Sequence, residues 1–166
     1  MASIPGWHSG TPSTWNARCW AFEHGLRVTE VLVSAVPDEH WHAPPPQKGR
    51  TIAAIVAHVY GLRRTFTKMA KVPVGPTLPA KTVTKEEALA ALAENREALV
   101  ALFRQAIAER RGRVPGMPKR TAVMMAYLMQ HDAHHRGQIT RQLSELGYSL
   151  PTEVNTTIWG WRKLQE

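Results

Sequence analysis

Prolines and glycines divide this chain into four long stretches in which apolar residues recur every three or four positions. The stretches cover residues 14–36, 51–72, 84–107 and 121–146. This spacing places apolar side chains on one face of an α-helix. None of the stretches shows the strict alternation that is typical of a half-buried β-strand. The pattern therefore predicts an all-α protein.

Local signals predict where the helices begin and end. Thr51 precedes the second stretch and can cap its first turn with the side-chain hydroxyl. Thr84 and Glu87 have the reciprocal spacing of a capping box at the start of the third stretch. Pro37 ends the first stretch, and Gly147 stands where a helix C-terminus favours glycine. These signals agree with the apolar periodicity.

The connections are rich in proline, whose fixed φ and missing N–H exclude helix interiors and central strands. Residues 38–48 and 72–83 are therefore expected to be irregular connectors. The length of 166 residues suits one domain over residues 1–166. We predict a four-helix bundle with long prolyl connections. The C-terminal tail, with Trp159 and Trp161, is expected to pack on this bundle or on a second subunit.

The formal charge of +8 and the pI near 10.2 raise the question of nucleic-acid binding. Most basic residues are scattered along the chain, and the one dense group lies in a connection rich in glycine and proline. That group consists of Arg110, Arg111, Arg113, Lys119 and Arg120. A solvated loop explains it more simply than a binding surface, so we do not expect a nucleic-acid partner.

The apolar runs, such as residues 53–59, are too short to span a bilayer. The first residues show neither a basic leader nor an apolar core segment, so no secretory signal is expected. A single cysteine, Cys19, excludes a disulfide within the chain. These features favour a cytoplasmic protein without a membrane span.

Two histidines stand four residues apart in the fourth stretch. His131 and His135 lie one turn apart on a helix, so both rings can bind one metal ion from the same face. The alternative is that each ring is a core imidazole that forms a hydrogen bond to a neighbouring group. A metal site needs a third ligand. His58, in the middle of the second predicted helix, is the candidate, since bundle cores build metal sites from facing helices.

Three neutral imidazoles would leave the ion its full charge and one open coordination position, which is typical of a catalytic site. Such a cation lowers the pKa of a bound water or thiol. The small residues Ala54 and Gly61 flank His58 by about one turn and would leave room beside the ring. The hypothesis is thus an open metal site on His58, His131 and His135.

The sequence resembles the DinB/YfiT-like superfamily of helical metal-binding proteins. The resemblance depends on residues 55–58, which end in His58, on the histidine-rich segment 131–139, and on the tail at residues 150–153 and 159–161. It implies a four-helix bundle, frequent homodimers, and zinc or nickel on three histidines. Members of this superfamily include transferases that use a low-molecular-weight thiol such as bacillithiol, mycothiol or glutathione, so the resemblance also implies an activity of this kind.

Three further residues continue the histidine-rich face and are candidates for orienting a ligand or binding a substrate. They are His134, Gln138 and Gln142; helix packing or surface exposure is the alternative for each. Asp132 and Arg136, also four apart, are predicted to form a surface ion pair without chemistry. No role in the site is expected for Cys19, or for the remaining histidines His8, His24, His40 and His42.

We expect a metal-dependent enzyme that activates a thiol, or water, for transfer to a small electrophilic substrate. Near the proposed ligands the sequence offers imidazoles and amides but no clear general base. That deficit favours a thiol, because a metal can ionise it without a proton shuttle. No catalytic side chain is assigned. The alternative is a metal-binding stress-response module without catalysis.

Overall fold

The computed structural model describes residues 14–160, and within them the chain is all helical. No strand occurs in these residues, so the all-α prediction is confirmed. The structure has six helices where the sequence predicted four. They are α1 (Thr14–Ser34), α2 (Asp38–Trp41), α3 (Ile52–Met69), α4 (Lys85–Ala108), α5 (Thr121–Glu145) and α6 (Thr152–Gly160).

The predicted caps determine where the long helices begin. The Thr51 hydroxyl accepts a hydrogen bond from the Ala54 N–H at 3.2 Å and starts α3. At the start of α4, the Thr84 hydroxyl accepts from the Glu87 N–H at 3.1 Å, and the Glu87 carboxylate accepts from the Thr84 N–H at 2.8 Å. Gly147 follows α5 with a φ of +81°, which glycine adopts without steric cost. The sequence signals for these ends are confirmed.

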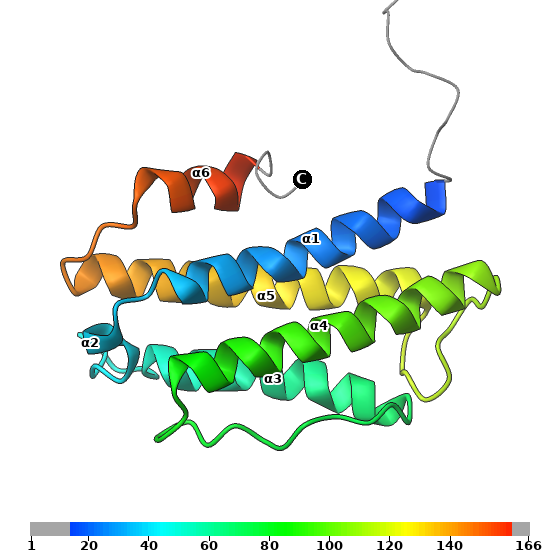
Figure 1. Cartoon of the computed structure of the whole chain (residues 1–166), viewed down its shortest axis with the longest axis horizontal. Helices are drawn as coiled ribbons and strands as arrows, with labels where there is room; N and C mark the ends of the chain where they lie inside the picture. The colour runs from blue at the N-terminus through cyan, green and yellow to red at the C-terminus, as the bar shows by residue number, and fades with distance from the viewer. Residues whose placement is uncertain (1–13, 161–166) are drawn as a thin grey trace, which may run out of the picture.

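Four long helices, α1, α3, α4 and α5, lie side by side along the molecule (Figure 1). Helices α3 and α4 run in the same direction, while α1 and α5 run in the opposite one. The segment between α3 and α4 must therefore return along the whole length of the helices. Its prolines keep it irregular on this path, and Arg64 holds it by donating to the Gly75 carbonyl oxygen at 2.7 Å.

The buried apolar side chains form two clusters between the long helices. One cluster includes Trp41, Ile52 and Leu143, near α2. The other includes Phe22 and Phe103, whose rings meet edge to face with centroids 5.0 Å apart. Together the two clusters bury most of the periodic apolar positions that predicted the helices, whereas Met69, at the end of α3, is exposed.

Helix α2 was not predicted, because residues 38–48 were expected to be irregular throughout. The prolines at 44–46 restrict only the residues beside them, so one turn of helix can form before them. Trp41 ends this turn, is 4% exposed, and donates its indole N–H to the Val83 carbonyl oxygen at 2.8 Å. This contact gives the short helix its tertiary support.

The tail beyond α5 packs against the long helices only in part. Helix α6 lies along α1 (Figure 1), with Thr157 buried and Ile158 packed on the core. Trp159 is 84% exposed, so its ring does not pack on the same chain, and of the two predicted contacts for the tail only the one with a second subunit stays open for this ring. Successive residues point about 100° apart on a helix, which turns Trp159 away from the side that Ile158 uses. Trp161 lies outside the described residues.

Gly116 lies in the connection between α4 and α5, in close contact with the end of α3. Its φ is +82°, and a Cβ at this position would overlap the Met69 carbonyl oxygen and lie 2.8 Å from the carbonyl carbon. We expect Gly116→Ala to lower the free energy of unfolding by about 2–4 kcal/mol, since backbone must move to admit the methyl group. Urea denaturation measures this loss.

Gly112, in the same connection, is the matched control. A Cβ there would meet no atom within 4 Å. Gly112→Ala should therefore change the free energy of unfolding by less than about 1 kcal/mol. Equal effects of the two substitutions would contradict the close packing of Gly116.

Candidate metal centre

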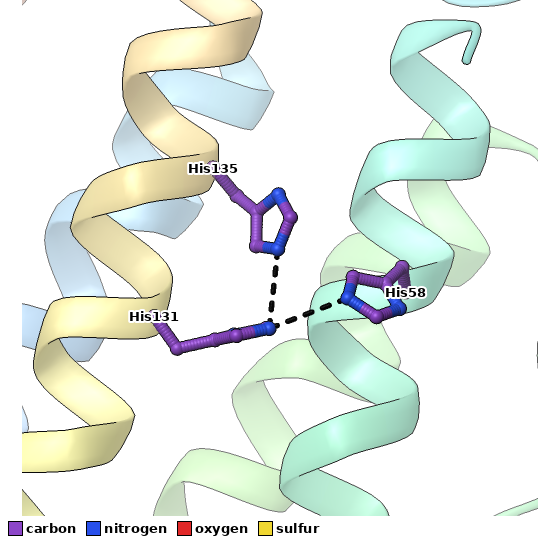
Figure 2. A group of neighbouring side chains, drawn as sticks. All are labelled: His58, His131 and His135. Carbon is purple, nitrogen blue, oxygen red and sulfur yellow. Dashed lines mark hydrogen bonds between the residues drawn. The ribbon is translucent and has the colours of Figure 1, made fainter. Parts of the chain in front are cut away.

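Three imidazoles converge between α3 and α5. His58 comes from α3, and His131 and His135 come from α5, with their rings directed toward one another (Figure 2). The His131 Nε2 atom lies 3.1 Å from the His135 Nε2 atom and 3.3 Å from the His58 Nε2 atom. One ligating nitrogen from each ring lies within 4.8 Å of those of the other two. The structure thus brings together the three histidines singled out in the sequence.

These donors fit a divalent metal ion. Tetrahedral ligands that lie 2.0–2.1 Å from an ion are about 3.3 Å from each other, close to the spacings of the His131 Nε2 atom. His58 is exposed, so the cluster is open to solvent on one side, while His135 is 6% exposed. Such a set can hold an ion and still leave it accessible.

The local environment favours the neutral imidazoles that metal binding requires. Burial, followed by the like charge of His135, lowers the pKa of His131 to about 4. Burial is also the main cause that lowers the pKa of His58 and of His135. These shifts favour the neutral form of all three rings at neutral pH, with nitrogen lone pairs available to an ion.

Gln138 orients the His135 ring. The His135 Nδ1 atom lies 2.8 Å from the Gln138 Oε1 atom, so Nδ1–H donates and the Nε2 lone pair faces the other two rings. The Gln138 amide nitrogen in turn lies 3.1 Å from the His134 Nε2 atom and donates to it. Gln138 and His134 thus form a hydrogen-bonded chain that ends at a candidate ligand.

A cavity of about 320 Å³ lies beside the histidine cluster. Its wall includes His135, Gln138 and Gln142 from α5, Ile55 from α3, and the connector at residues 45–50. The third candidate for ligand orientation, Gln142, therefore faces this cavity. The connector residues were not singled out in the sequence, because nothing local to them shows that they reach α5.

Asp132 and Arg136 do not form the predicted surface ion pair. Asp132 is fully buried and forms an ion pair with Arg63 of α3, which is also fully buried. Besides two hydrogen bonds from Arg63, its carboxylate accepts one from the Thr29 hydroxyl of α1 at 2.7 Å. Arg136 instead donates to the Gly25 carbonyl oxygen at 3.0 Å and to the Thr29 hydroxyl. The prediction failed because α5 buries two faces, one against α3 and one against α1.

A sequence signal for this buried pair existed. Asp132 lies four residues after Leu128 and seven before Ile139, which is the spacing of a buried helical stripe. Arg63 follows Val59 by four residues in the same way. Charged residues at such positions in two neighbouring helices indicate a buried ion pair.

The remaining candidates stay apart from the cluster. Cys19 is buried, and burial raises the pKa of its thiol, so it is not an activated nucleophile. His24 stacks on Trp20, His40 lies against Tyr148, and the His42 ring bonds to the Val83 carbonyl oxygen. His8 lies outside the described residues.

The fold and the site define an all-helical protein in which two long helices bring three imidazoles together at one open position. The sequence model of the DinB family matches residues 19–160, and the chain therefore belongs to the DinB family. This confirms the resemblance noted from His58, the histidine-rich segment and the tail. No curated protein and no solved structure matched the chain. Among residues 14–160, no helix combines the length and hydropathy of a membrane span.

Proposed function

We propose that this protein is a metal-dependent enzyme in which His58, His131 and His135 hold a divalent cation, zinc or nickel. The convergence of their nitrogens, within 4.8 Å of one another, is the observation that supports the proposal. A cation bound there would supply one kind of chemistry, a lowered pKa for a thiol or water. The reaction proposed is transfer of a low-molecular-weight thiol to a small electrophile.

The surrounding residues favour a thiol over water as the nucleophile. Hydrolysis needs a group that moves protons, and the carboxylates nearby are engaged. Asp132 is buried in its ion pair with Arg63. Glu145, on the cavity wall, accepts hydrogen bonds from Arg141 at 2.8 Å and from Gln47 at 3.4 Å. A thiol ionised by the cation needs no such base.

A metal-binding module without catalysis is the second candidate. It would use the ion only to tie α3 to α5, with no vacant position beside it. The cavity beside His135 and the exposure of His58 favour the enzyme, since both leave space for a substrate. The two functions thus differ in whether small molecules reach the cluster.

Turnover with thiols tests the proposal. We expect the zinc- or nickel-loaded protein to consume at least one thiol from a panel of cellular thiols when a chloro-aromatic or an epoxide is supplied. The His131→Ala variant lacks one candidate ligand and serves as the control. It should consume no thiol under the same conditions. The loss of free thiol and the formation of the thioether are measured by mass spectrometry. If no pair of substrates reacts while the protein holds its metal, the transferase is ruled out and the module remains.

A further inference from the structure

We propose that the cavity beside His135 binds a carboxylate group of the substrate or co-substrate, through Lys48, Arg50, Arg141 and the buried amide of Gln142. This inference rests on the proposed function, since it names the chemistry of the molecule that would react at the histidine cluster.

The charge of the cavity wall is positive. Three cationic side chains line it, Lys48, Arg50 and Arg141, against one carboxylate, Glu145. The Arg141 Nε atom donates to Glu145 at 2.8 Å, which offsets one charge of each sign. No residue in 14–160 forms an ion pair with Lys48 or Arg50. The wall therefore keeps about two uncompensated positive charges, which attract an anion.

Gln142 supplies an unused hydrogen-bond donor in the same wall. Its side chain is 6% exposed, and its Nε2 atom is buried without a hydrogen-bond partner. A buried polar atom without a partner destabilises the protein, so it favours a ligand that accepts its hydrogen bond. A carboxylate oxygen is such an acceptor, and the guanidinium groups of Arg50 and Arg141, which line the same cavity, match a carboxylate in shape.

The size and position of the cavity favour a small molecule that also reaches His135, the member of the histidine cluster that lies in the cavity wall. Its volume of about 320 Å³ lies at the lower end of the range for small-molecule sites. Because His135 shares the wall with the cationic residues, a molecule that fills the cavity contacts both.

Two thiols that differ only at one end test the proposal. The zinc-loaded full chain is titrated by calorimetry with 3-mercaptopropionate and with 3-mercaptopropanol. We expect the acid to bind about tenfold more tightly, the effect of one or two charge-assisted hydrogen bonds. The double variant Lys48→Gln/Arg50→Gln should lose this preference without losing zinc, and Gln142→Leu should reduce it.

The control removes two charges elsewhere. Lys81 and Arg113 are exposed and lie outside the cavity wall, so Lys81→Gln/Arg113→Gln should keep the preference. If net charge alone governed anion binding, the preference for the acid thiol would fall in both double variants. That result would overturn the proposal.

A second titration shows which molecule carries the carboxylate. Glutarate, which has no thiol, is added to the zinc-loaded protein and to His131→Ala. Glutarate binding that depends on Lys48 and Arg50, with equal affinities for the two thiols, assigns the carboxylate to the electrophile. If neither the acid thiol nor glutarate binds in a way that depends on these residues, the proposal is wrong. Carboxylate binding without any turnover would contradict the proposed reaction and leave the carboxylate site supported.

Discussion

Replacing Asp132 with alanine is expected to lower the free energy of unfolding by about 3–5 kcal/mol. The loss is large because the partner of Asp132 stays buried without an opposite charge. Arg63 is fully buried, and its guanidinium would lose the carboxylate that neutralises it. The Thr29 hydroxyl, which donates to the same carboxylate at 2.7 Å, would lose its acceptor as well. Urea denaturation of the metal-free protein measures the change without a contribution from bound ion.

Two comparisons separate the buried charge from other effects of the substitution. The double variant Arg63→Met/Asp132→Leu removes both charges and should recover much of the loss, because apolar pairs often replace buried ion pairs without cost. Asp38, 83% exposed, pairs with Lys85 at the surface, and Asp38→Ala should cost less than about 1 kcal/mol. A loss for Asp132→Ala as small as for Asp38→Ala would show that Arg63 finds another partner or reaches water.

Replacing any one of His58, His131 and His135 with alanine is expected to weaken metal binding by more than about 100-fold. Loss of a residue that only orients a ligand typically costs 10–100-fold, and loss of a ligand costs more. The metal content of the purified protein, measured by elemental analysis, should fall from near one ion per chain to near zero.

The chain offers graded controls for this loss. Gln138→Leu removes the acceptor of the His135 Nδ1–H and should weaken binding by about 10–100-fold. His134 forms no hydrogen bond to a candidate ligand; it contacts His135 by an edge-to-face ring contact and through Gln138, so His134→Ala should have a smaller effect. Full retention of the ion in His58→Ala would mean that α3 supplies no ligand, and the three-histidine proposal would fail.

The two predictions concern the same pair of helices. His58 and Arg63 lie on α3, while His131 and Asp132 are neighbours on α5. The buried ion pair therefore determines how far α3 can slide along α5, and with it which turn of α3 faces the His131 ring. We therefore expect Asp132→Ala to weaken metal binding as well as to lower the free energy of unfolding.

Much of the fold could be predicted from the sequence because its causes are local. A proline ends a helix through its own ring, and the hydroxyls of Thr51 and Thr84 cap the turns directly after them. The pairing of His131 with His135 is local in the same sense, since four residues make about one turn. His58 could be predicted to join them because it lies in the middle of a second helix, and bundle cores build metal sites from facing helices.

The sequence by itself therefore determined the four long helices, most of their ends, and the ring pair on α5. Only the tertiary structure decided that Asp132 is buried with Arg63, that Trp159 faces outward, and that the connector carrying Lys48 and Arg50 forms the cavity wall. The physical reason is that burial and pairing depend on which neighbours cover each face. A helix such as α5, packed on two sides, buries a second face beside its main apolar one, and which helix covers that face depends on the packing of the whole molecule.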